Sequence, residues 1–176
     1  DSKDTTALEF DNNSVVINSF SKYYSMTGWR LGWVVVPKEA VRTIEKLIQN
    51  LFICPSHASQ LLGLYSLKYS KPFQDNVEEY KTNRDILMKN LPHLGFQDIV
   101  KPDGAFYIYA NISKFQKTSE VLVKEILNKT GVAITPGNDF DTTRGHDTVR
   151  FSYSCSTSDV KNAVKRLALW CKTLNI

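Results

Sequence analysis

The sequence predicts an α/β protein. Short β-branched runs at residues 15–17 and 34–36 are typical of buried strands. Longer segments repeat apolar residues every three or four positions, which is typical of amphipathic helices. Proline and glycine separate the two kinds of segment, and the 176 residues are enough to enclose a sizeable core. Strands and helices therefore share one chain.

The first part of the chain is expected to contain two strands and two helices. Pro37 ends the second strand, and Pro55 with Ser56 marks the start of the second helix. That helix has a broad apolar face, which predicts that it is well buried. The expected elements are a loop at 1–13, strands at 14–18 and 31–36, and helices at 38–50 and 56–69.

The second part is expected to begin with a long helix whose apolar positions follow a 3.6-residue period. Ser156 with Asp159 resembles a capping box at the start of the last helix. The expected elements are helices at 73–91, 119–129 and 156–174, and strands at 96–100, 105–110, 132–135 and 148–154.

Composition excludes several classes of protein. The chain is 42% hydrophobic and 23% charged, with a formal charge of +4 and no basic cluster, so nucleic-acid binding is not expected. No apolar stretch approaches the ~18–20 residues of a membrane span. The three cysteines and three histidines are scattered, which predicts neither a disulfide framework nor a metal site. With no signal peptide visible, we expect a cytoplasmic protein.

One stretch between the first two strands concentrates groups that bind anions. Ser19, Ser21, Lys22 and Arg30 lie there together with two glycines. Serine hydroxyls and a guanidinium can hold a phosphate. A lysine amine in a desolvated pocket can form a Schiff base with a carbonyl. The pattern therefore predicts a site for a ligand that carries both a phosphate and a carbonyl.

A second candidate is Arg150, within the strand expected at 148–154. Alternation places Val149, Phe151 and Tyr153 on one face of this strand and Arg150 on the other. An arginine on a polar face can bind a carboxylate through two parallel hydrogen bonds. From this stretch alone, a solvated strand arginine without a binding role is the favoured interpretation.

Three motifs together resemble the class I/II aminotransferases, pyridoxal-phosphate (PLP) enzymes of fold type I related to aspartate aminotransferase. Ser19-Phe20-Ser21-Lys22, followed by Thr-Gly-Trp-Arg-Leu-Gly at 27–32, resembles their Schiff-base signature. Pro-Asp-Gly-Ala-Phe-Tyr at 102–107 resembles a turn close to the substrate. The segments 131–137 and 149–152 resemble the motif that ends in the substrate-binding arginine.

The resemblance implies an α/β fold with two domains. Residues 1–75 would be the C-terminal part of the large PLP-binding domain, which has a mixed, mostly parallel sheet. Residues 76–176 would be the small αβ C-terminal domain, and the helix at 73–91 would bridge the two. The resemblance further implies transamination between an α-amino acid and a 2-oxo acid, by an enzyme that is a homodimer at full length.

The same resemblance assigns roles to the candidate residues. Lys22 would hold PLP as a Schiff base and then move the proton at the substrate α-carbon. Ser19, Ser21 and Arg30 would hold the cofactor phosphate, and Arg150 would bind the substrate α-carboxylate. One departure is Asp141 after Phe140, where relatives often have glycine, so the contacts of that loop are open.

The chain is expected to be a fragment with an incomplete site. The resemblance covers only the C-terminal ~45% of a full family member. The cofactor domain of such a member is by itself longer than this chain. The family's ring-nitrogen aspartate and ring-hydroxyl tyrosine would fall ahead of Asp1. We therefore expect this polypeptide alone to be largely inactive. Two alternatives stay open: another fold type I PLP enzyme (a lyase, a decarboxylase or a cyclopropane-forming ACC-synthase-like enzyme), or a non-catalytic αβ binding module.

Overall fold

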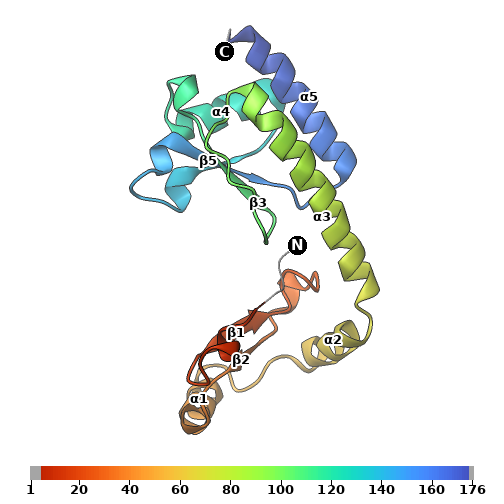
Figure 1. Cartoon of the computed structure of the whole chain (residues 1–176). Coiled ribbons are helices and arrows are strands. Elements are labelled where there is room, and N and C mark those ends of the chain that lie inside the picture. The colour runs from red at the N-terminus through yellow and green to blue at the C-terminus, as the bar shows by residue number, and fades with distance from the viewer. Residues whose placement is uncertain (1–4, 175–176) are drawn as a thin grey trace. The chain divides into compact units, whose positions relative to one another are not determined.

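The structure is a computed structural model that describes residues 5–174. The chain divides into two compact units, Asp1–Val77 and Glu78–Ile176. The boundary falls inside the longest helix, α3 (Lys71–Asn90), which is labelled in Figure 1.

The first unit contains an antiparallel ribbon and two helices. Strand β1 (Val16–Ser19) pairs with β2 (Gly32–Val35), so that Ser19 lies opposite Gly32. Helices α1 (Lys38–Leu51) and α2 (His57–Lys68) follow, which confirms both predicted helices to within a residue at each end. The N-terminal segment includes one short 3-10 turn, η1 (Ala7–Glu9), where only loop was predicted. Residues 1–4 of that predicted loop lie outside the described part.

The predicted burial of the two strands is wrong. Ile17 is 81% exposed, and Val34 and Val35 also belong to the exposed residues. Seven of the eight residues of β1 and β2 are exposed and Val16 is half-buried, and within the described residues the two strands pair only with each other. β-branched residues favour a strand whether or not another layer covers it.

The predicted burial of α2 is also wrong. Small residues face inward, because Ser59, Gly63 and Ser66 are the buried positions of this helix. Gly63 packs so closely that an added Cβ would lie 2.5 Å from the Leu31 side chain. The large apolar residues of α2 point outward instead: Leu61, Leu64, Tyr65 and Leu67 are all exposed.

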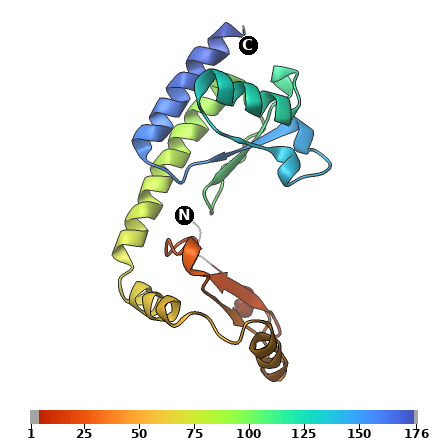
Figure 2. The ribbon, with the colours of Figure 1, turned by 180° about the vertical axis from the view of Figure 1, so that it is seen from behind.

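The second unit has a three-stranded sheet covered on one face by helices. The strand order is β3 (Tyr107–Asn111), β5 (Thr148–Ser152) and β4 (Thr135–Pro136), with antiparallel pairing throughout. Helices α4 (Ser119–Thr130) and α5 (Thr157–Thr173) complete the unit, and α3 and α5 run side by side in both Figure 1 and Figure 2.

The core of the second unit lies between this sheet and its helices. It follows strand alternation, because Ile108, Val149 and Phe151 point inward while their neighbours Tyr109 and Arg150 are on the other face. The helices contribute Leu87, Leu91, Leu122, Ile126, Val160, Leu167 and Trp170 to the same cluster. The predicted inward face of Val149, Phe151 and Tyr153 is therefore confirmed.

Several predicted strand boundaries are wrong. No strand forms at 96–100, where Gln97 makes an isolated bridge to Asn111, because Asp98 adopts a left-handed backbone (φ 52°) that interrupts pairing. The strand predicted at 132–135 is shifted to β4, and the strand at 148–154 ends at Ser152. Every strand pair within residues 5–174 is antiparallel, so the mostly parallel sheet expected of a complete large domain is not represented in this part.

The helix ends follow local chemistry. Helix α3 starts two residues earlier than predicted, because proline is tolerated in the first turn of a helix. At the start of α5, the Ser156 hydroxyl accepts a hydrogen bond from the Asp159 backbone N–H at 3.1 Å and donates one to the Asp159 carboxylate at 2.7 Å. The predicted N-cap is thus confirmed, although the carboxylate contacts the hydroxyl rather than a backbone N–H.

None of the helices within residues 5–174 is both long and apolar enough to cross a membrane.

Candidate active site

The turn after β1 is fixed by one buried aromatic side chain. Phe20 is 6% exposed and packs against Trp33 and Tyr24. Its backbone N–H donates to the Leu31 carbonyl at 3.1 Å, and its carbonyl accepts from the Met26 N–H at 3.2 Å. This packing and these two hydrogen bonds fix the backbone between Ser19 and Ser21.

A close backbone approach at Gly32 keeps the ribbon in register. A Cβ at this position would lie 2.6 Å from the Asn18 carbonyl oxygen. Only glycine fits there without moving the opposite strand. Gly32 therefore allows the close approach of the two strands that holds the backbone at Ser19 in place.

The structure brings the two predicted serines into direct contact. The Ser19 hydroxyl donates to the Ser21 hydroxyl at 2.8 Å and accepts from the Ser21 N–H at 3.0 Å. Lys22 lies in the same turn with an exposed side chain, and its carbonyl accepts from the Ser25 N–H at 3.0 Å. Hydroxyls and an amine therefore occur within four consecutive residues.

Arg30 lies in the same unit and beside a surface hollow. It has a left-handed backbone (φ 50°, ψ 48°) after the 3-10 turn η2 (Thr27–Trp29), and its Nη1 donates to the Thr27 carbonyl at 2.8 Å. The Ser59 hydroxyl donates to the Trp29 carbonyl at 2.8 Å and so ties α2 to this turn. The hollow measures about 610 Å³ and is lined by Gly28, Trp29, Arg30, Phe52, Pro55, Ser56 and Ser59. Its lining does not include Lys22 or the serine pair.

Arg150 occupies the uncovered face of the sheet in the second unit. Its strand neighbours are Tyr109 on β3 and Thr135 on β4. The guanidinium carbon lies 4.1 Å from the centre of the Tyr107 ring and 3.9 Å from that of Phe140. Its Nε is buried and has no hydrogen-bond partner among the described residues.

The charge of Arg150 also influences a neighbouring phenol. Burial raises the pKa of Tyr109 above its ordinary value of 10.0, and the nearby Arg150 cation partly opposes that rise. The carboxylates of Asp141 and Asp139 add to it. Tyr109 therefore remains a neutral phenol at physiological pH, beside a fixed positive charge.

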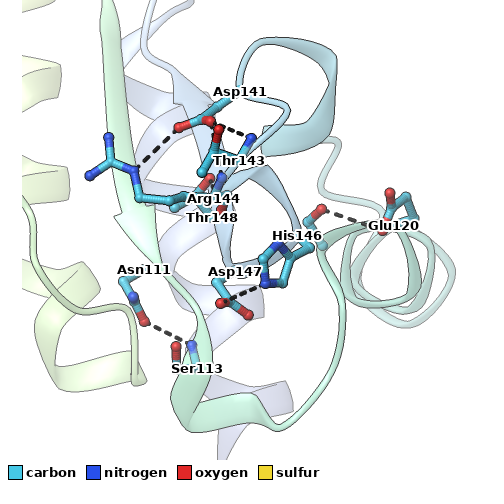
Figure 3. Close-up of polar contacts among 10 residues, drawn as sticks. Asn111, Ser113, Glu120, Asp141, Thr143, Arg144, His146, Asp147 and Thr148 are labelled. Carbon is cyan, nitrogen blue, oxygen red and sulfur yellow. Dashed lines mark hydrogen bonds and ion pairs between the residues drawn. The ribbon is translucent and has the colours of Figure 1, made fainter.

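The loop that carries Phe140 is closed by Asp141 (Figure 3). The Asp141 Oδ1 accepts from the backbone N–H groups of Thr143 at 2.8 Å and Arg144 at 3.0 Å, and its Oδ2 lies 3.5 Å from the Arg144 Nε. The two backbone hydrogen bonds, assisted by Arg144, hold the pKa of this carboxyl below its usual 3.8. Asp141, which stands at the position where glycine was expected, therefore closes the loop with its own side chain.

One further side-chain contact ties the loop to α4, and another joins two consecutive residues at its end. Asn138 donates a hydrogen bond to Glu120 in the first turn of α4. His146 pairs with Asp147 at 3.0 Å, next to the start of β5 (Figure 3). No cluster of three or more His, Cys, Asp or Glu side chains suited to a metal ion occurs within residues 5–174.

Sequence reasoning missed the two rings that contact Arg150. For Tyr107 a signal existed, because alternation from the buried Ile108 places it on the same face as the arginine. For Phe140 no periodic signal existed, since it follows the 3-10 turn η5 (Gly137–Asp139) in an irregular loop.

Comparison with known proteins identifies the family of this chain. Residues 4–167 match the profile of the family described as aminotransferase class I and II. The chain belongs to this family. Valine–pyruvate aminotransferase from Mycobacterium tuberculosis is 40% identical over 166 residues, which cover 93% of this chain and 43% of that protein.

Solved structures agree with this aminotransferase assignment. A structure from Silicibacter pomeroyi superposes with a TM-score of 0.94 at 48% identity, over 98% of this chain and 46% of that one. An aminotransferase from Mycobacterium tuberculosis gives a TM-score of 0.92 at 39% identity, over 97% of this chain and 45% of that one. The α/β fold is thus that of part of a fold type I aminotransferase, and the chain spans less than half the length of these relatives.

Proposed function

We propose that this chain is part of a PLP-dependent aminotransferase that moves an amino group between an α-amino acid and a 2-oxo acid. The observation that carries the proposal is the family match, which extends over residues 4–167 and includes Lys22, Arg30 and Arg150. One relative is named for valine and pyruvate, which suggests this pair as the first substrates to test.

The residues of the first unit fit the chemistry of the proposed cofactor. Two hydroxyls 2.8 Å apart, a guanidinium and a primary amine are donors suited to a phosphate-bearing aldehyde. Ser19, Ser21 and Arg30 would hold the phosphate, and Lys22 would attach the aldehyde carbon. PLP, when bound, supplies an electron sink for the negative charge that develops at the substrate α-carbon.

The chain's own residues would divide the remaining work. The Lys22 amine would take the proton from the substrate α-carbon as a general base already in place. Arg150 would bind the α-carboxylate, because a guanidinium can donate two parallel hydrogen bonds to it. The two functions come from different units of the chain.

We further propose the domain assignment that the family implies. Residues 1–75 belong to the large cofactor-binding domain and residues 76–176 to the small domain, with α3 connecting them. The division of the structure into compact units at Val77 and Glu78 supports this proposal. We also propose that the full-length enzyme is a cytoplasmic homodimer.

Covalent trapping of PLP tests the role of Lys22. The purified chain is incubated with PLP, reduced with borohydride and digested, and the labelled peptides are identified by mass spectrometry. We expect the label on Lys22 and its loss in Lys22→Arg. Lys46 on α1 is an exposed lysine of the same unit, so Lys46→Arg is the matched control and should label as the unchanged chain does. Equal labelling of both lysines would contradict the proposal.

An activity assay tests the extent of the site in this chain. Because the chain spans 43–46% of its relatives, we expect weak PLP binding and little amino transfer from valine to pyruvate. Full turnover by this polypeptide alone would show that the residues present suffice. In a full-length enzyme containing this sequence, transfer that depends on the 2-oxo acid distinguishes an aminotransferase from a lyase or decarboxylase.

A further inference from the structure

We propose that Tyr107 and Phe140 act as positioning residues that hold the Arg150 guanidinium ready for a carboxylate. These two residues are called the aromatic clamp below. The inference rests on the proposed function in one respect, namely that the ligand of Arg150 is a carboxylate. The contacts themselves lie entirely within the second unit.

The clamp is built from two separate elements. Tyr107 is on β3 opposite Ser152, two residues along β5 from Arg150, which makes it a diagonal neighbour on the same face. Phe140 reaches the guanidinium from the loop closed by Asp141. Ring centres at 4.1 and 3.9 Å from the guanidinium carbon are well within the range for cation–π contact.

Phe140 has no place in the hydrophobic core. It is 52% exposed, whereas the aromatic core residues Phe96 and Phe151 are nearly fully buried. Besides contacting Arg150, its ring lies edge-on to that of Tyr109, with 6.4 Å between the ring centres. A large apolar ring that remains half in water therefore gains its contact mainly from the arginine and the adjacent phenol.

No acidic side chain within residues 5–174 forms an ion pair with Arg150. Asp141 is engaged by two backbone N–H groups and by Arg144. The buried Arg150 Nε has no hydrogen-bond partner among residues 5–174. The clamp therefore holds the cation through ring contacts at its guanidinium carbon and not through its N–H groups.

Holding an arginine in this way lowers the cost of binding. A free arginine side chain loses considerable rotamer freedom when it is immobilised, and preorganisation removes this loss from the binding step. Ring contact also favours the planar guanidinium over a lysine ammonium, which cannot make two parallel bonds. Loss of one ring should therefore weaken carboxylate binding while the positive charge remains.

The test uses the whole chain and the side-chain Nε–Hε NMR signal of Arg150, which is assigned by its disappearance in Arg150→Lys. Ring currents should shift this signal upfield of the other arginines. The probe is pyruvate, titrated while the signal is followed. Variants are Phe140→Leu and Phe140→Tyr, and Phe10→Leu is the control because Phe10 is an 82% exposed phenylalanine of the other unit.

We expect Phe140→Leu to move the Arg150 signal downfield and to weaken pyruvate binding about five- to thirty-fold. Phe140→Tyr retains a ring and should stay within about twofold of the unchanged chain, as should Phe10→Leu. Tyr107→Leu should resemble Phe140→Leu, and Tyr107→Phe should resemble the unchanged chain. Backbone amide spectra check that each variant is folded.

The outcomes separate the two claims. An Arg150 signal without an upfield shift, or a Phe140→Leu variant that binds pyruvate as tightly as the unchanged chain, overturns the clamp. A shifted signal that responds to Phe140→Leu but not to pyruvate supports the clamp as a device that holds the arginine. That same result contradicts carboxylate binding by Arg150 in this chain.

Discussion

Replacement of Asn83 tests how the strand that carries Arg150 is held in the second unit. This α3 residue is fully buried, and its Nδ2 donates to the carbonyls of Tyr153 at 3.1 Å and Cys155 at 2.7 Å. Both carbonyls belong to the segment between β5 and α5. The Oδ1 of Asn83 is buried without a hydrogen-bond partner among the described residues.

The expected cost of Asn83→Ala follows from these contacts. The buried Tyr153 carbonyl loses its donor, at about 1–3 kcal/mol, and the Cys155 carbonyl, whose hydrogen bond is only partly buried, adds a smaller loss. Removal of the unpaired Oδ1 offsets part of this loss, because a buried polar atom without a partner is itself destabilising. We therefore expect the free energy of unfolding of the second unit to fall by about 2–4 kcal/mol.

Asn83→Asp gives a sharper test because its effect should depend on pH. An aspartate turns an acceptor toward the two carbonyls, so the folded state favours the protonated acid and raises its pKa. The variant is then least impaired below about pH 4, the unfolded pKa, and loses about 1.4 kcal/mol per pH unit as the pH rises from there toward the folded pKa. At neutral pH it should be less stable than Asn83→Ala.

Urea unfolding, followed by the amide NMR signals of β3 and β5, measures these changes. Asn90→Ala is the control, since Asn90 donates only to the Ile86 carbonyl within the same helix, and it should cost less than about 1 kcal/mol. The reasoning is refuted if Asn83→Ala costs no more than this control. It is also refuted if Asn83→Asp is as stable at pH 7 as at pH 4.

Three further predictions concern the loop and the thiols. Gly137→Ala should destabilise the second unit by about 1–3 kcal/mol in thermal unfolding, because its Cβ would lie 2.1 Å from the Thr148 Oγ1 and within 2.7 Å of two carbonyl oxygens. The backbone hydrogen bonds that lower the Asp141 pKa stabilise the loop above about pH 4 and are lost as the pH falls further. The Phe140 ring signals should therefore shift in acid, and Asp141→Asn should abolish that shift. Burial raises the pKa of Cys171 to about 11, so at pH 8 its labelling by a thiol reagent should be far slower than that of exposed Cys54; comparable rates would contradict the burial.

Local patterns predicted most elements, but not what covers them. Alternation in 149–153 placed the side chains of β5 on the correct faces, because the strand has a core on one side. A β-branched run failed as a sign of burial at residues 15–17, because Val15 and Ile17 are exposed in a ribbon of two strands. In α2 the apolar residues indicated a helix correctly, yet close packing at Gly63 reversed which side faces inward.

The candidate site shows a similar division. A contact between residues close in the sequence, such as Ser19 and Ser21, can be predicted, since a short turn fixes their separation. The contact between Phe140 and Arg150 depends on an irregular loop whose closure by Asp141 is a side-chain effect. Neither helix nor strand periodicity encodes such a contact.

The two units differ sharply in how much apolar surface they bury. The hydrophobic core cluster is drawn entirely from the second unit, whereas Phe20 and Met26 are the buried hydrophobic residues described in the first. Resistance to proteases follows local stability, because cleavage requires the backbone to open. Limited digestion should therefore remove the first unit early and leave a protected piece that begins within α3. The chain would then lose its lysine signature while Arg150 and its two rings remain folded.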